Sequence, residues 1–142
     1  MQTVIPRTDN PDIEKKFKIL MVIDDSLPDR FIAEKLISRT NLTKKLLIKD
    51  SAINALSYFS ENMDVSDIPD VILLDIRMPE MDGFEFLEKF NSLPDFIKNT
   101  CKIYMLTSSA YTEDKRRAVS YPYVVGYVTK PLTDKVLKEV FE

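Results

Sequence analysis

Five side chains in this sequence have the chemistry needed to accept a phosphoryl group. Asp24 and Asp25 are adjacent, Asp75 and Thr107 each follow a short apolar run, and Lys130 lies near the end of the chain. A carboxylate can attack phosphorus to give an aspartyl phosphate, and a lysine and a hydroxyl can hold the phosphoryl oxygens. This chemistry requires residues that are far apart in the sequence to meet in one place.

A cluster of these carboxylates needs positive charge beside it. Two carboxylates 4 Å apart repel each other by roughly 4 kcal/mol at an effective dielectric constant of about 20. Lys130 and a divalent cation are the candidates to offset this repulsion. The sequence has no histidine and a single cysteine, so oxygen ligands remain, and Mg²⁺ fits them better than zinc does. We therefore expect Mg²⁺ beside Asp24, Asp25 and Asp75.

Each candidate residue stands at or near the end of an apolar run that is typical of a β-strand. Four consecutive apolar residues precede Asp75, as in a strand that is buried on both faces. A longer run ends at Asp24, another ends at Thr107, and a last one ends shortly before Lys130. The predicted strands are residues 17–23, 46–49, 71–74, 103–106 and 123–128.

Helices are predicted between the strands from apolar spacing and capping residues. Ser26 with Asp29, and Asp82 with Glu85, have the spacing of capping boxes. The predicted helices are residues 26–39, 51–62, about 82–93, 112–120 and 132–141. In the first helix, the apolar residues that recur at helical spacing are Leu27, Phe31, Ala33, Leu36 and Ile37.

Regular alternation of strands and helices predicts an α/β fold with one doubly wound parallel sheet. The carboxyl ends of parallel strands share one rim, where such folds bind their ligands. The candidate residues should therefore converge there. Taken singly, Asp75 could be a turn residue, Thr107 a helix cap and Lys130 a solvated loop lysine. Asp24 and Asp25 could simply begin a helix, but none of these readings explains a shared rim.

Composition limits the other functional classes. The chain has 142 residues, enough for one domain at 17–142, with residues 1–16 as a flexible extension. A net charge of −3 offers no broad basic surface for nucleic acid or an anionic membrane, and no apolar run spans a bilayer. We expect a cytoplasmic protein. Two separate glycines exclude a phosphate-binding Gly-rich loop, and the lack of histidine excludes Ser-His-Asp and Cys-His catalysis.

Four short motifs, in this order, give the sequence its family resemblance. They are Asp24-Asp25, residues 73–83 around Asp75, Leu106-Thr107-Ser108 and Thr129-Lys130-Pro131. Together they resemble the receiver domain of two-component response regulators, of the stand-alone, chemotaxis-like type. The likeness covers residues 17–141. It implies a flavodoxin-like five-stranded sheet in the order 2-1-3-4-5.

The resemblance also implies roles for the acidic residues. Asp75 is the expected phosphoacceptor, charged by a phosphohistidine on a sensor histidine kinase or a histidine phosphotransfer protein. Asp25, Asp75 and the backbone carbonyl of Arg77 are the expected Mg²⁺ ligands, with Asp24 acting largely through bound water. The side chain of Arg77 occupies a position at which the family tunes the lifetime of the acyl phosphate.

The same resemblance assigns the remaining residues. Thr107 and Lys130 would contact the phosphoryl oxygens, and Tyr127 would be the aromatic residue that turns inward when Thr107 moves, although it could simply be a core tyrosine. The peptide bond between Lys130 and Pro131 is expected to be cis. The last helix is short, so the usual signalling face beside it should be small.

The resemblance predicts a signalling domain that catalyses only its own phosphorylation and slow dephosphorylation. It would act as a diffusible switch for an unknown downstream protein, or as a phosphorelay intermediate, and would be a monomer or weak homodimer. One alternative is a phosphorylation-independent interaction module of the same fold. Another is an aspartate-nucleophile phosphatase of the haloacid dehalogenase type, but those enzymes have a second aspartate where this chain has Arg77.

Overall fold

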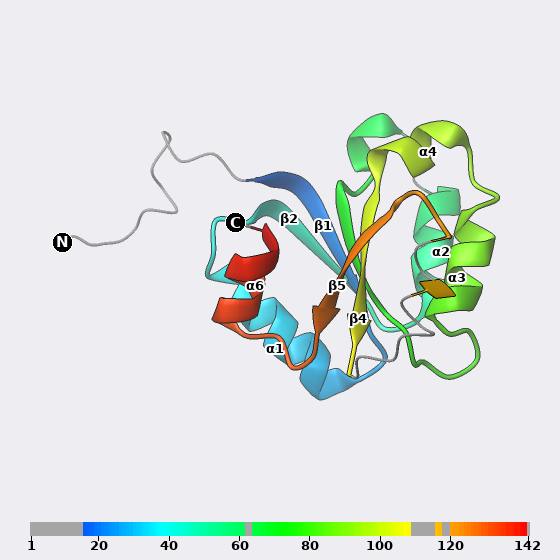
Figure 1. Cartoon of the computed structure of the whole chain (residues 1–142). Helices are drawn as coiled ribbons and strands as arrows, with labels where there is room; N and C mark the ends of the chain where they lie inside the picture. The colour runs from blue at the N-terminus through cyan, green and yellow to red at the C-terminus, as the bar shows by residue number, and fades with distance from the viewer. Residues whose placement is uncertain (1–15, 62–63, 109–115, 118–119, 142) are drawn as a thin grey trace.

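Five parallel strands form one sheet at the centre of the molecule. The computed structural model describes residues 16–61, 64–108, 116–117 and 120–141. The sheet order is β2-β1-β3-β4-β5, and every neighbouring pair is parallel (Figure 1). This confirms the predicted fold class and strand order. The strands are β1 (Phe17–Ile23), β2 (Thr43–Lys49), β3 (Val71–Asp75), β4 (Lys102–Thr107) and β5 (Val124–Thr129).

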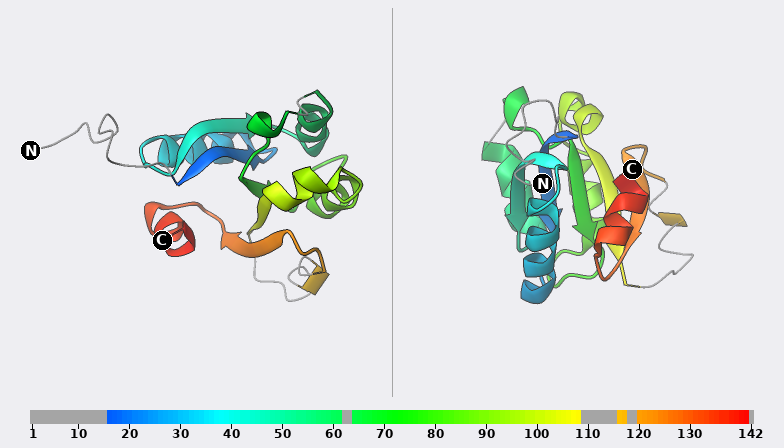
Figure 2. Two further views of the ribbon diagram at one scale, coloured as in Figure 1. Left: turned by 90° about the horizontal axis from the view of Figure 1, so that it is seen from above. Right: turned by 90° about the vertical axis from the view of Figure 1, so that its left-hand side faces the viewer.

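Helices cover both faces of the sheet. In Figures 1 and 2, α1 (Leu27–Ser38) and α6 (Asp134–Phe141) lie on one face, while α2 (Ala52–Glu61) and α3 (Gly83–Phe90) lie on the other. A short 3₁₀ turn, η2 (Val65–Asp67), precedes β3. None of the helices among the described residues has the length and apolar character needed to cross a membrane.

The segment after α3 differs from the prediction. A six-residue helix, α4 (Asp95–Thr100), lies between α3 and β4, where no helix was expected. Pro94 is its N-cap, and Ile97 is fully buried beneath it. Pro94 predicts the end of the preceding helix, but proline also favours the first turn of a new one. The predicted helix at 112–120 lies mostly outside the described residues.

The core is divided by the sheet into two apolar layers. Alternate residues of each central strand face opposite sides, so Ile72 and Leu74 join the layer under α2 and α3, whereas Val71 and Leu73 face α1 and α6. All five residues of β3 are buried, as predicted for this strand. The α2 and α3 layer is rich in aromatic side chains, and the ring of Phe90 contacts those of Phe59, Phe86 and Tyr123.

Two of the apolar residues of α1 do not join the core. Leu27 and Phe31 are 68% and 57% exposed, whereas Ala33 and Ile37 are buried against the sheet. Residues 31 and 33 are two positions apart and so lie on nearly opposite sides of a helix. The predicted apolar residues therefore divide between two faces of α1, and only one face meets the sheet.

The two ends of the described chain are held together at the amino end of the sheet. The ring of Phe141, at the end of α6, makes edge contacts with Phe17 on β1 and Tyr104 on β4. The Lys16 ammonium group also donates a hydrogen bond to the Phe141 carbonyl. The short last helix is thus fixed to the sheet by its final aromatic residue.

Candidate functional site

The carboxyl ends of four strands bring the predicted residues to one rim, at the lower edge of the sheet in Figure 1. Asp24 follows β1, Asp75 ends β3, Thr107 ends β4 and Lys130 follows β5. The strands are in register here, because Asp75 lies opposite Leu106, one residue before the end of β4. The sheet thus brings together side chains that are more than a hundred residues apart in the sequence.

Three carboxylates form the centre of this rim. One carboxylate oxygen from each of Asp24, Asp25 and Asp75 lies within 4.8 Å of the others. Asp24 and Asp75 are only 2% and 6% exposed, whereas Asp25 is open to solvent. Hard divalent cations prefer oxygen ligands and retain some of their waters. The arrangement therefore suits a metal ion that is held from inside and hydrated from outside.

Lys130 supplies the positive charge within the cluster. Its ammonium nitrogen lies 2.9 Å from Asp24 Oδ2, 3.0 Å from Asp29 Oδ2 and 3.3 Å from Asp75 Oδ1. The backbone nitrogen of Lys130 donates to the carbonyl of Thr107 at 2.8 Å, which fixes this residue beside β4. The peptide bond to Pro131 is cis, as predicted.

The contacts within the cluster shift the pKa values of Asp75 and Lys130. Burial, together with the negative charge of Asp24, raises the pKa of Asp75 from 3.8 to about 7, and Lys130 opposes the rise. Burial lowers the pKa of Lys130, but hydrogen bonds to Asp24 and Asp29 outweigh it and raise the pKa above its usual value. One lysine therefore does not neutralise the carboxylates around it.

The first turn of α1 is built differently from the prediction. Ser26 caps the helix, since its hydroxyl accepts from the Asp29 backbone nitrogen at 3.3 Å. The reciprocal bond of a capping box is absent from this turn, because the Ser26 nitrogen donates to Asp24 Oδ1 at 3.0 Å and the Asp29 carboxylate contacts Lys130. The Ser26 cap is therefore confirmed, and the predicted capping role of the Asp29 carboxylate is wrong.

Asp29 is the site residue that the sequence reasoning missed. One signal could have found it, because helical side chains point back toward the helix N-terminus. An acidic residue in the first turn of α1 is thus directed toward the rim from which the helix starts. The pairing with Lys130 depends on the position of β5, which sequence spacing does not give.

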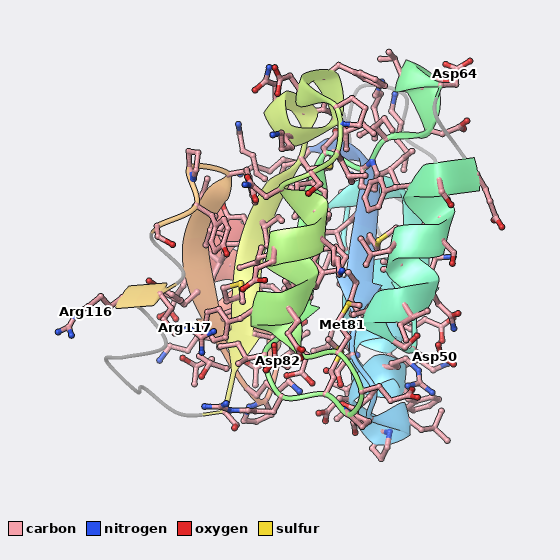
Figure 3. All side chains as sticks on the ribbon, turned by 90° about the vertical axis from the view of Figure 1, so that its right-hand side faces the viewer. Asp50, Asp64, Met81, Asp82, Arg116 and Arg117 are labelled. Carbon is pink, nitrogen blue, oxygen red and sulfur yellow. The ribbon has the colours of Figure 1, made fainter. Side chains whose placement is uncertain are left out.

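The loop after Asp75 is held by a very close backbone contact. The Gly83 nitrogen donates to the Ile76 carbonyl at 2.8 Å, and a Cβ atom on Gly83 would lie 2.6 Å from the Asp75 carbonyl oxygen. Only glycine fits there without a shift of the backbone. The predicted capping box of Asp82 and Glu85 is confirmed, with bonds of 2.9 and 3.0 Å, and Asp82 lies at the rim end of α3 in Figure 3.

Thr107, Tyr127 and Arg77 are the remaining predicted residues. Thr107 is 6% exposed at the end of β4. Tyr127, on β5, is partly buried and packs against the aromatic layer under α2 and α3. Arg77 follows Asp75 by two residues, and its side chain is exposed.

The comparisons with known proteins point to one family. A family model described as "Response regulator receiver domain" matches residues 20–142. Chemotaxis protein CheY1 of Helicobacter pylori is 30% identical over 123 residues, which cover 87% of this chain and 93% of that protein. Sensor histidine kinase CheAY of the same organism is 34% identical over 128 residues, or 86% of this chain. The chain spans only 14% of the length of CheAY.

Solved structures agree with the fold. A response regulator receiver protein from Dyadobacter fermentans is 32% identical, with a TM-score of 0.75 over 87% of this chain and 94% of that one. The Mn²⁺-bound form of response regulator Rcp1 has a TM-score of 0.68 at 23% identity, and the match covers 87% of this chain and 88% of that one.

Proposed function

The chain belongs to the response regulator receiver family, and we propose that Asp75 is the residue on which it carries the phosphoryl group. Receiver domains are phosphoacceptors of two-component signalling rather than enzymes that act on a separate substrate. The supporting observation is the buried carboxylate of Asp75, with Lys130 at 3.3 Å and two further carboxylates beside it.

The phosphoryl donor is a phosphohistidine. An oxygen of Asp75 forms a bond to phosphorus as the P–N bond of the donor breaks, and the electron pair of that bond remains on the imidazole nitrogen. Asp75 must be ionised to attack, and the Lys130 ammonium favours the ionised form. Lys130 also offsets the charge of the phosphoryl oxygens, while the Thr107 hydroxyl donates a hydrogen bond to one of them.

We assign the metal to Asp24, Asp25, Asp75 and the backbone carbonyl of Arg77, and Mg²⁺ is the proposed ion. When bound, it supplies positive charge to the carboxylates and the phosphoryl oxygens. The surplus of carboxylate over ammonium groups at the rim supports this assignment. The Rcp1 structure is described as binding Mn²⁺, an ion that takes similar oxygen ligands.

The partner that phosphorylates Asp75 is a sensor histidine kinase or a histidine phosphotransfer protein. Receiver domains act with histidine kinases, and one relative is itself a sensor histidine kinase. The new negative charge then draws Thr107 toward the phosphoryl group, and Tyr127 turns inward. A downstream protein in the cytoplasm reads this change, and the chain is a monomer or weak homodimer that binds neither nucleic acid nor membrane.

Labelling by a small donor tests the proposal. We expect acetyl phosphate with Mg²⁺ to add one phosphoryl group, seen by intact mass, and expect the addition to disappear with a metal chelator. Asp75→Asn should abolish it. Asp50→Asn is the matched control, because Asp50 is an exposed aspartate near Asp25, in the loop before α2 (Figure 3).

Equal labelling of wild type and Asp75→Asn would overturn the assignment of Asp75. Absence of labelling, both by acetyl phosphate and by a phosphorylated histidine kinase, would favour the phosphorylation-independent interaction module. Release of inorganic phosphate from small phosphate esters at many turnovers per chain would favour the phosphatase.

A further inference from the structure

We infer that Asp29 is a positioning residue that holds Lys130 in the unphosphorylated protein and releases it when the phosphoryl group arrives. This inference rests on the proposed function of Asp75. It starts from the three contacts of the Lys130 ammonium nitrogen, at 2.9 Å to Asp24, 3.0 Å to Asp29 and 3.3 Å to Asp75. The lysine is closer to Asp29 than to the proposed phosphoacceptor.

The donors of Lys130 are all engaged before phosphorylation. An ammonium group has three N–H donors, and the structure gives it three carboxylate acceptors. A phosphoryl oxygen can be contacted only if one of these acceptors gives up its donor. The transfer of phosphorus to Asp75 therefore requires an exchange of partners at Lys130.

Burial decides which acceptor is exchanged. The side chain of Asp24 is 3% exposed, so water cannot rehydrate its carboxylate when Lys130 leaves, although the hydrogen bond from the Ser26 backbone nitrogen remains. The side chain of Asp29 is 39% exposed and can be rehydrated when the lysine leaves. Asp75 itself receives the phosphoryl group, so of the other two acceptors Asp29 is the one that costs less to release.

The Asp29 contact is nevertheless more than a loose surface pair. The Lys130 side chain is 16% exposed, and the two residues border a hollow of about 20 Å³, lined also by Val22, Leu106 and Leu132. This hollow has room for about one water molecule. Asp29 is held at the rim by the first turn of α1, whose cap is Ser26. Because Lys130 leaves this contact on phosphorylation in our proposal, the pair stabilises only the unphosphorylated state.

Asp29 should therefore slow phosphorylation without changing the decay of the product. An oxygen of Asp75 attacks phosphorus while the bond from phosphorus to the donor oxygen breaks, and acetate leaves with the electron pair. Lys130 has to leave Asp29 before or during this step. After the step, Lys130 contacts the phosphoryl group both in the phosphorylated product and in the transition state for its hydrolysis. Asp29 therefore affects the free energies of these two states alike.

The experiment compares both rates in the full chain at saturating Mg²⁺. We expect Asp29→Asn to raise the rate of labelling by acetyl phosphate about two- to five-fold, the range set by partly exposed ion pairs. The half-life of the label after donor removal should stay at the wild-type value. Asp29→Glu retains the charge and should behave as wild type.

Asp134→Asn is the matched control, because it removes a first-turn acid of α6 that also pairs with a cation, Arg39, away from the rim. Its labelling rate should not change. A labelling rate of Asp29→Asn at or below wild type would overturn the inference, as would an equal rise in labelling and decay, which indicates a loosened site. Labelling of Asp75→Asn would instead overturn the proposed function.

Discussion

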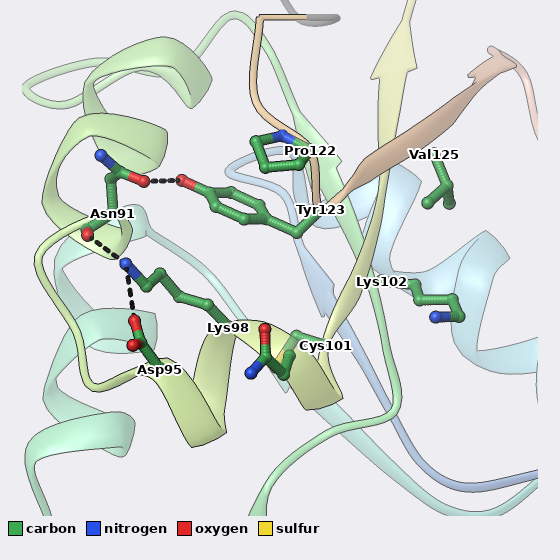
Figure 4. A pocket seen from close by; sticks show the side chains of 9 residues that line it. Asn91, Asp95, Lys98, Cys101, Lys102, Pro122, Tyr123 and Val125 are labelled. Carbon is green, nitrogen blue, oxygen red and sulfur yellow. Dashed lines mark hydrogen bonds and ion pairs between the residues drawn. The ribbon is translucent and has the colours of Figure 1, made fainter.

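The two ends of the sheet are both polar, but they differ in how deeply their charged side chains are buried. At the amino end, a groove of about 460 Å³ lies between α3, α4 and the start of β5 (Figure 4). Several of its polar groups pair with one another, since Lys98 donates to the Asn91 carbonyl at 2.9 Å and pairs with Asp95 at 3.5 Å. The Tyr123 hydroxyl donates to Asn91 Oδ1 at 3.0 Å.

At the carboxyl end, the charges do not balance. Asp24, Asp25, Asp29 and Asp75 surround a single lysine, and two of these carboxylates are almost completely buried. The charged side chains that line the wide groove, Asp95, Lys98 and Lys102, are exposed or partly exposed to water, whereas the rim holds buried carboxylates around one lysine. The comparison shows that unbalanced buried charge, rather than the size of a hollow, locates the chemistry in this molecule.

Removing the two lysines gives the largest expected contrast. Lys130→Ala leaves the buried carboxylates without their cation and should lower the free energy of unfolding by about 3 kcal/mol. Lys98→Ala removes a lysine whose partner Asp95 is 89% exposed, and should cost about 1 kcal/mol or less. Urea unfolding without metal measures both values. Equal losses would remove the distinction between the two ends.

The pH dependence of stability should reveal the unbalanced charge directly. The pKa of Asp75 is raised from 3.8 to about 7, so without metal the folded state keeps a proton that the unfolded chain releases. The contribution of Asp75 to the free energy of unfolding is fully present below about pH 4 and is lost as the pH rises through about 7.

The Asp75→Asn variant has no titrating carboxyl at this position, so its free energy of unfolding should rise relative to that of the wild type as the pH increases from about 4 to 8. The raised pKa corresponds to a ceiling of about 4 kcal/mol, and solvent screening at the rim lowers the expected gain to about 2 kcal/mol near pH 8. Urea unfolding over this pH range, with a chelator present, provides the measurement. Parallel pH profiles for the two proteins would contradict the prediction.

The smallest expected effect is at the amino end. Tyr123→Phe removes a hydroxyl that donates to Asn91 Oδ1, while the ring keeps its contact with Phe90, and should cost about 1 kcal/mol. Phosphorylation of Asp75 should not change, since the groove lies at the other end of the sheet. A loss of labelling in this variant, measured by intact mass, would show that the two ends are coupled.

Much of the fold could be predicted because its signals are local. The apolar run of β3 is too short for a helix and ends at Asp75, and the same pattern at Ile23 and Leu106 places their polar successors on one rim. The capping box of Asp82 and Glu85 also depends only on neighbours in the sequence. The order of the strands came from the family resemblance rather than from the apolar pattern.

The features that were missed depend on tertiary contacts. The six-residue helix α4 is too short to show a period, and it is stabilised by the burial of Ile97. Which face of α1 meets the sheet, and hence the exposure of Phe31, is set by packing. Asp29 has the spacing of a capping residue, and only the approach of Lys130 from the far end of the chain draws it into the site.

The ring contacts of Phe141 with Phe17 and Tyr104 have a practical consequence for labelling the protein. Phe17 begins β1 and Asp24 follows its last residue, so the two lie seven steps of a strand apart, or about 23 Å. A fluorophore or fusion partner attached beyond Phe141 would therefore be anchored at the opposite pole from the acidic rim. Such a probe leaves the approach of a kinase to Asp75 unobstructed, so labelled protein can be followed during phosphotransfer itself.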